Sequence, residues 1–249
     1  MEPTYFISHH GASCKKTFYI DFGEMKRILV IFTLLFCFSQ AFSQTHYDSR
    51  VSVGAHGGID LSRVFFTPSV KQGWPVNPML GVGIRYVEEK YFGLIAEVNY
   101  VRRGWSENFE GKPFNYRRDL DYIDIPVFAH IYFGNRFKFF LNAGPQIAFR
   151  LGESVTANFD PYDIINTPGF PLNNRRNNQL TEKVVQKIDY GISAGLGCEY
   201  SINPRNSVTL EARYYFGLGN IFSSKRQDIF RASNMMYIAI NAGYWFRFK

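Results

Sequence analysis

Cysteine is scarce in this chain, with only three among 249 residues, at positions 14, 37 and 198. The first two lie in a segment that we expect to be removed, and the one that remains, Cys198, forms no disulfide within the chain. The five histidines and three cysteines also lack the spacing of a metal site. We therefore expect neither a disulfide framework nor a bound metal, and we predict no cofactor.

Long apolar runs are missing after residue 43. A transmembrane helix needs about 20 apolar residues, so a helical membrane bundle is excluded. The one apolar run, residues 28–38, follows a short basic start and precedes small residues, as in a secretory signal peptide. We assign the signal to residues 25–43, with cleavage after Ser43. Residues 1–24 are either an extended leader or sequence upstream of a true start at Met25, which we favour.

Basic residues form no run longer than two, as at Arg175 and Arg176, although the formal net charge is +7. No stripe of Lys and Arg with interleaved aromatic residues is present, so we predict no nucleic-acid partner. Attraction to anionic lipid head groups is the better use of the positive charge.

What the sequence does contain is apolar and polar alternation with the period of a β-strand, best seen in the stretch 119–150. Its first arm carries Ile123, Ile125, Val127, Ala129 and Ile131 on one face and Tyr122, Asp124, Pro126, Phe128 and His130 on the other. A second arm follows the turn at Gly134 and Asn135. A lone carboxylate such as Asp124 is costly in an apolar core, whereas a membrane barrel turns its polar face to the lumen.

Eight such segments follow one another: 50–61, 78–88, 91–103, 117–133, 136–150, 184–201, 205–218 and 234–248. Short and long connections alternate between them, and the aromatic content is 18%, typical of membrane-barrel girdles. We predict an all-β fold for residues 44–249: an eight-stranded antiparallel up-and-down transmembrane β-barrel in the outer membrane, with both termini periplasmic.

The inward faces of these strands collect charges of both signs. The acidic ones are Asp60, Glu97, Asp124, Asp189, Glu199 and Glu211, and the basic ones are Arg85, Lys138, Arg150, Lys187, Arg213 and Arg247. Eight strands enclose a lumen that side chains just fill, so we predict a paired charge network and a plugged barrel with little conductance.

The evidence for a catalytic site is weaker than the evidence for this structural charge network. His56 and Asp60 share the inward face of the first strand, as in some rim-sited lipid-modifying enzymes, but spacing alone places no serine with them. Gly191, Gly195 and Gly197 lie inside a strand pattern, where we expect them to relieve crowding in the lumen. We therefore predict a protein that is not an enzyme.

The longest expected loop, 151–183, is the candidate recognition element, because binding residues concentrate in loops on rigid scaffolds. Its candidate contacts are Phe159, Tyr162, Phe170, Arg175 and Arg176. The aromatic residues among them either contact a partner or pack over the barrel mouth, and the sequence does not separate these alternatives.

Five segments resemble the PorT or porin-like family of small outer-membrane barrels of Bacteroidetes. They are YIDIPV (122–127), FLNAGPQ (140–146), DYGISAGLGCEY (189–200), ARYYFGLGN (212–220) and INAGYWFRF (240–248). The resemblance implies an eight-stranded outer-membrane barrel, and one branch of that family assists type IX secretion. It also implies that Phe248 is read by the barrel insertion machinery, although Lys249 follows it here.

The leading functional hypothesis is a non-enzymatic outer-membrane barrel whose outer loops bind a partner or serve structurally. The alternatives are an accessory protein of type IX secretion and a rim-sited lipid-modifying enzyme. The expected partners are outer-membrane lipid, the insertion machinery and other secretion or envelope proteins.

Overall fold

The computed structural model describes residues 49–172, 175–224 and 228–248, so the expected upstream extension, signal peptide and cleavage site lie outside the described residues. The strands are β1 (Arg50–Thr67), β2 (Gln72–Gly73), β3 (Val76–Val87), β4 (Phe92–Glu107), β5 (Tyr116–Gly134), β6 (Phe137–Ala157), β7 (Ile188–Ser201), β8 (Asn206–Asn220) and β9 (Ala232–Arg247). A short 3-10 helix, η1, spans Asn178–Leu180. Within these described ranges, no helix is long and apolar enough to cross a membrane.

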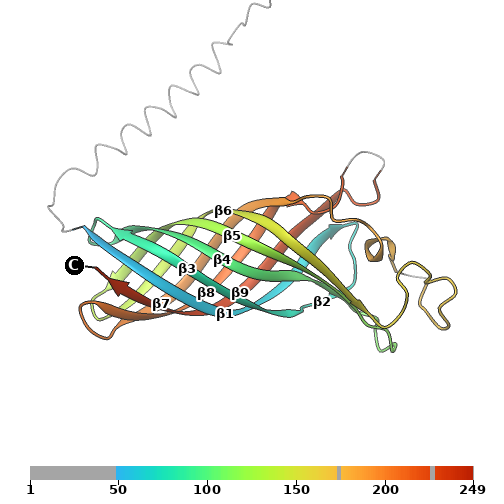
Figure 1. Cartoon of the computed structure of the whole chain (residues 1–249), viewed down its shortest axis with the longest axis horizontal. Coiled ribbons are helices and arrows are strands. Elements are labelled where there is room, and N and C mark those ends of the chain that lie inside the picture. The colour runs from blue at the N-terminus through green and yellow to red at the C-terminus, as the bar shows by residue number, and fades with distance from the viewer. Residues whose placement is uncertain (1–48, 173–174, 225–227, 249) are drawn as a thin grey trace, which may run out of the picture. The chain divides into compact units, whose positions relative to one another are not determined.

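The eight long strands form a closed ring (Figure 1). Their order is β4-β3-β1-β9-β8-β7-β6-β5, each antiparallel to its neighbours, and β5 pairs back to β4. Strand β2 has only two residues and adds to β4 at Glu107, beyond the β3 pairing. The chain is therefore an all-β, eight-stranded antiparallel up-and-down barrel, and the prediction of the fold is confirmed.

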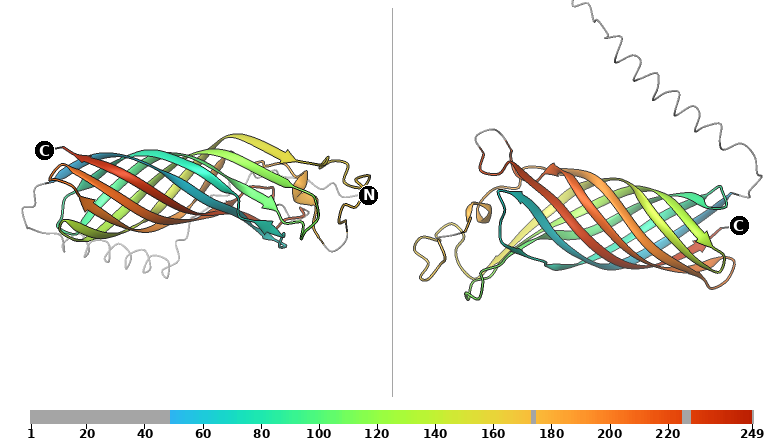
Figure 2. Two further views of the ribbon diagram at one scale, coloured as in Figure 1. Left: turned by 90° about the horizontal axis from the view of Figure 1, so that it is seen from below. Right: turned by 180° about the vertical axis from the view of Figure 1, so that it is seen from behind.

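The two ends of the barrel differ in their connections (Figures 1 and 2). At the turn end lie the short connections, residues 88–91, 135–136 and 202–205, and at the loop end lie the long ones, residues 68–75, 108–115, 158–187 and 221–231. Strand β1 begins at the turn end, because Arg50 pairs with Val87, the residue before the first short connection, and strand β9 ends there too, because Ser52 pairs with Arg247. The predicted alternation of short and long connections is present.

Several strands continue further toward the loop end than the alternation predicted. Strand β1 reaches Thr67, β4 reaches Glu107 and β6 reaches Ala157. The β1–β9 ladder holds to the pair Thr67 and Ala232, although the sequence there no longer alternates cleanly. Pairing with a neighbour, which a single segment does not reveal, therefore sets these boundaries.

Strand β7, by contrast, is shorter at the loop end than predicted, since it begins at Ile188 and not at residue 184. The residues before it leave the ladder so that Val184 is buried in the interior. Arg150 holds the departing chain, because its backbone N–H donates to the Lys187 carbonyl and its side chain donates to the Val184 carbonyl.

The outward surface is apolar and graded along the barrel axis. Its middle is aliphatic, with exposed Leu80, Val82, Leu94, Val98, Val127, Leu141, Leu196 and Leu210. Exposed aromatic side chains gather toward the turn end at Tyr86, Phe133, Phe137, Tyr200, Tyr244 and Phe248, and toward the loop end at Phe65, Trp74, Phe149 and Tyr190. An aliphatic band between aromatic girdles is the outer surface expected of a barrel in a bilayer.

Candidate functional site in the barrel lumen

The lumen is filled by side chains in successive layers along its axis, and the first polar layer lies nearest the turn end. We call it the turn-end layer: Arg85, Lys138 and Glu199. Arg85 and Lys138 both contact the Glu199 carboxylate, Lys138 at 2.8 Å from Oε1 and Arg85 through Nη1 at Oε2. The Arg85 guanidinium also stacks on the Trp245 ring, 4.6 Å from its centroid. The Glu199 carboxylate thus forms ion pairs with two cations.

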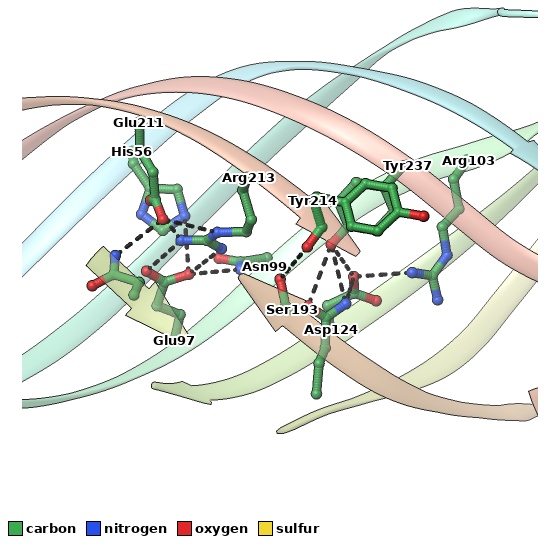
Figure 3. Close-up of polar contacts among 12 residues, drawn as sticks. His56, Glu97, Asn99, Arg103, Asp124, Ser193, Glu211, Arg213, Tyr214 and Tyr237 are labelled. Carbon is green, nitrogen blue, oxygen red and sulfur yellow. Dashed lines mark hydrogen bonds and ion pairs between the residues drawn. The ribbon is translucent and has the colours of Figure 1, made fainter. Parts of the chain in front are cut away.

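The middle layer surrounds Arg213, whose side chain is fully buried (Figure 3). Arg213 Nη1 and Nη2 donate to the two Glu97 oxygens at 2.7 and 3.1 Å, and Nη2 also donates to Glu211 at 2.8 Å. His56 Nε2 lies 3.6 Å from Glu97. Asn142 donates to Glu211 at 3.0 Å. One guanidinium therefore neutralises two carboxylates in a bidentate arrangement that an ammonium does not reproduce.

The loop-end layer surrounds Arg103, which has no solvent exposure (Figure 3). Its guanidinium nitrogens lie 3.3 Å from Asp124 and 3.2 Å from Asp189. Its Cζ atom lies 4.1 Å from the centroid of Tyr122 and 4.9 Å from that of Tyr215, so the cation is held between aromatic faces.

Three contacts cross the full width of the lumen. They are Arg85 (β3) with Glu199 (β7), Glu97 (β4) with Arg213 (β8), and Asp124 (β5) with Tyr237 (β9), the last at 3.2 Å. In each of these opposed pairs the two strands are four places apart in the ring of eight. The opposed pairs therefore fill the lumen from wall to wall.

Above the loop-end layer the interior becomes aromatic. Phe66, Trp105, Phe222 and Phe230 are buried there. Phe66 packs edge-on against Trp105 at 5.6 Å and stacks with Phe222 at 5.6 Å. Such contacts add to the burial of apolar surface, and together they close the loop end of the lumen.

Part of the long connection 158–187 folds back as a lid over this aromatic interior. Phe159 and Phe170 pack against each other and against Phe109 and Phe114, with centroids 5.0 to 5.8 Å apart. Arg175 fixes the lid, because it lies 2.7 Å from Glu107 and 4.1 Å from the centroid of Phe109.

The neighbouring loop carries an exposed ion pair. Lys71 donates to Glu110 at 2.7 Å, and this hydrogen bond lowers the pKa of that carboxyl. The pair links the connections after β1 and β4 at the surface of the loop end.

A cavity of about 690 Å³ opens at the turn end, below the turn-end layer. Its lining includes Arg50, Arg85, Lys90, Lys138, Glu199 and Arg247. Further inward, a separate space beside His56, Glu97 and Trp245 has a volume of only about 10 Å³. The cavity is thus a vestibule that ends at the middle of the barrel.

The structure brings most of the predicted lumen charges together. The following are buried: Asp60, Arg85, Glu97, Asp124, Asp189, Glu199, Glu211 and Arg213. Lys138 and Arg247 are half-buried beside the turn-end cavity. Arg150 is half-buried at the loop end, 2.8 Å from Glu153.

Lys187 differs from its prediction, because it is exposed and precedes the first residue of β7. Its prediction as a lumen residue extends the alternation four residues beyond the first residue of β7. Once the chain leaves the ladder, alternation no longer fixes the direction of a side chain.

Sequence reasoning missed Arg103, the centre of the loop-end layer. It was placed as the last residue of a strand and was not counted with the interior. The signal was present, since Arg103 shares the parity of Glu97 in β4 and therefore its face. Glu107 was also missed, because its position was expected in a loop.

The predicted loop contacts divide into two groups. Phe159 and Phe170 pack over the barrel mouth as part of the lid described above, together with Arg175. Tyr162 and Arg176 are exposed.

The residues weighed for catalysis lie inside the barrel. His56 and Asp60 are both buried in the lumen. A Cβ on Gly195 would overlap the Glu211 carboxylate, and one on Gly197 would overlap the Phe140 ring, so these glycines do relieve crowding. Among the described residues, no group of three or more metal-ligating side chains is placed to hold a metal ion.

Comparison with known proteins gives one family and several solved structures. The family model described as an outer membrane protein beta-barrel domain matches residues 38–223. Neisserial surface protein A is 14% identical, with 81% of this chain and 100% of that chain covered and a TM-score of 0.47. OprG from Pseudomonas aeruginosa is 11% identical, with 80% and 95% covered and a TM-score of 0.46. No curated protein matches.

Proposed function

Because this chain belongs to the outer membrane protein beta-barrel domain family, we propose that it is a non-enzymatic integral barrel with a closed, charge-filled lumen and loops used for binding or support. One observation carries the proposal: aliphatic side chains cover the outside while ionic side chains pair with one another inside. That distribution suits hydrocarbon outside and little solvent inside.

The proposed orientation places both termini and the short turns in the periplasm, with the long connections outside the cell. Its support is the segregation of short and long connections to opposite ends. The test uses a Cys198→Ala background with one new cysteine, either Ile165→Cys in the long connection or Asn135→Cys in a short turn. A membrane-impermeant maleimide labels the first in intact cells and the second only after lysis. The reverse pattern contradicts the orientation.

Recognition at the outer surface is proposed for the exposed part of the connection 158–187. Tyr162 is 81% exposed and Ile165 is 79% exposed, whereas the lid residues beside them are packed. Exposed apolar side chains on a loop anchored to a rigid barrel suit a partner surface. Replacing both residues with Ser is expected to leave the barrel folded and to lower the adhesion of intact cells to the surface that they colonise. Unchanged adhesion points to a structural role for the loop.

A second candidate is an accessory role in type IX secretion. Its support is the order and spacing of the five segments that resemble the PorT group, from residue 122 to residue 248. Deletion of the gene lowers the amount of secreted cargo if this role holds. Unaffected secretion rejects it and leaves the first proposal untouched.

The non-enzymatic part of the proposal is tested with His56→Ala. His56 is buried beside Glu97 in the lumen, a position suited to the charge network. Mass spectra of lipid A from cells with either form of the protein are expected to be identical. A difference that follows the substitution restores the lipid-modifying alternative.

A further inference from the structure

The turn-end cavity carries an excess of one charge. Among the residues that the structure describes, five basic side chains line it, Arg50, Arg85, Lys90, Lys138 and Arg247, and one acidic side chain, Glu199. They come from β1, β3, β6, β9 and the turn between β3 and β4. Cations from five separate segments thus converge on one space, and the low-dielectric wall concentrates their field there.

The floor of the cavity is the turn-end layer, and it already holds an anion, the Glu199 carboxylate. One oxygen of the Glu199 carboxylate accepts a hydrogen bond from Lys138 at 2.8 Å, and the other oxygen accepts one from Arg85. Two cations therefore share one carboxylate, which leaves the floor with one positive charge in excess. Arginine offers five N–H donors in a fixed fork that matches carboxylate and phosphate oxygens.

The cavity wall adds aromatic surface beside the cations. Tyr91 and Tyr132 line it, with Lys90 lying 5.3 Å from the Tyr91 centroid and Lys138 lying 5.6 Å from the Tyr132 centroid. His130 stacks on Tyr132 with centroids 5.3 Å apart. These rings suit the uncharged body of a ligand whose charged head lies on the floor.

We propose that the turn-end cavity binds a small polyanion through phosphate or carboxylate groups. The volume of about 690 Å³ falls within the range of about 300–1,000 Å³ typical of small-molecule sites. The middle layer closes the inner end, so the anion enters and leaves by the turn end and does not cross the barrel. This binding site goes beyond the proposed function, and it stands whichever side of the membrane the turn end faces.

Trp245 supplies a reporter for the site. It stacks on Arg85, which lines the cavity, and it is one of three tryptophans in the chain. In a Trp74→Phe/Trp105→Phe background, Trp245 emission reports on the floor alone. Calorimetry on the unmodified protein gives the same affinity without these substitutions.

The experiment titrates the purified full-length mature barrel in lipid nanodiscs with pyrophosphate or citrate at constant ionic strength. We expect a saturable change in Trp245 emission and a saturable heat. Tighter binding of pyrophosphate identifies a phosphate ligand, and tighter binding of citrate identifies a carboxylate ligand. Absence of saturation with both anions overturns the proposal.

Matched variants separate the site from general charge. Lys90→Gln/Lys138→Gln removes two cavity cations and is expected to weaken binding about tenfold or more, since charged hydrogen bonds are strong. Arg136→Gln removes a cation from a turn at the same end but outside the cavity lining, and it should bind as the unmodified protein does. If the double variant does not fold, Lys90→Gln alone, in an exposed turn, is expected to weaken binding measurably. Equal weakening in Arg136→Gln overturns the proposal.

Discussion

Arg213 and Glu97 meet across the full width of the lumen, although 116 residues of chain separate them. Their two hydrogen bonds, 2.7 and 3.1 Å long, join strands that are four places apart in the ring. Both side chains are almost completely buried, so the contact with the partner charge must compensate each of them for the hydration that it loses. The unequal roles of the two partners give the first prediction.

Arg213→Gln destabilises the barrel more than Glu97→Gln does. The first change leaves two buried carboxylates, Glu97 and Glu211, without their cation, and the expected cost is about 3–5 kcal/mol. The second leaves Arg213 paired with Glu211 and costs about 1–3 kcal/mol. Urea unfolding in lipid vesicles measures both free energies. Equal costs contradict the shared guanidinium.

Arg103→Met is expected to cost about 3–5 kcal/mol, because it leaves Asp124 and Asp189 buried without their common cation. Arg103→Lys lies between this variant and the unmodified protein, since an ammonium does not bridge both carboxylates and stack on Tyr122. The control is Arg102→Met, whose side chain is 41% exposed, with an expected cost of about 0–1 kcal/mol. A similar loss in both methionine variants would argue against a buried role for Arg103.

Leu196→Arg tests the outward face in the middle of the barrel. Leu196 is 66% exposed, and an arginine facing hydrocarbon at the bilayer centre costs about 2–4 kcal/mol. Ile165→Arg, in a connection and 79% exposed, is the control, with an expected change within about 0.5 kcal/mol. Unfolding in vesicles compares them, and a neutral Leu196→Arg removes the lipid contact inferred for this face.

The barrel is expected to conduct few ions in planar bilayers. The middle and loop-end layers and the aromatic interior each fill the lumen, and the free space beside the middle layer is only about 10 Å³. Arg213→Ala removes one layer only, so it too should show no steady channel. A large, steady conductance from the unmodified protein contradicts the closed lumen.

Arg175→Gln is expected to loosen the lid without unfolding the barrel. The substitution removes the contact to the Glu107 carboxylate and the stacking on Phe109. Limited chymotrypsin digestion then cuts faster after Phe109, which is otherwise buried beneath the Arg175 guanidinium. Arg176→Gln, at an exposed neighbour, should leave the cutting rate unchanged. Acceleration in Arg176→Gln as well would mean that charge alone, and not the Glu107 contact, controls the lid.

The alternation of residues was sufficient to predict the strands and the fold, because one face of each strand meets apolar surroundings and the other meets the lumen. In β5, Asp124, Phe128 and His130 all lie inward as their parity requires. The same rule places Arg103 inward in β4. That residue was overlooked only because the predicted strand ended at it.

Pairing partners and strand ends were beyond the reach of the sequence. Glu97 gives no sign within its own segment that its partner is Arg213, because the partner depends on the closure and stagger of the whole ring. Lys187 continues an alternating pattern, yet the chain has already left the ladder there. The burial of Arg175 likewise depends on a long connection folding back onto Glu107.

The opposed pairs also limit how this protein can be assembled. Four consecutive strands of the ring never contain both members of an opposed pair, since those members are four places apart. A half-barrel fragment therefore keeps unmatched ions on its concave side, and two co-expressed halves are stable only after they associate. The opposed contacts exist only in the finished cylinder, so they stabilise the closed ring and neither half of it.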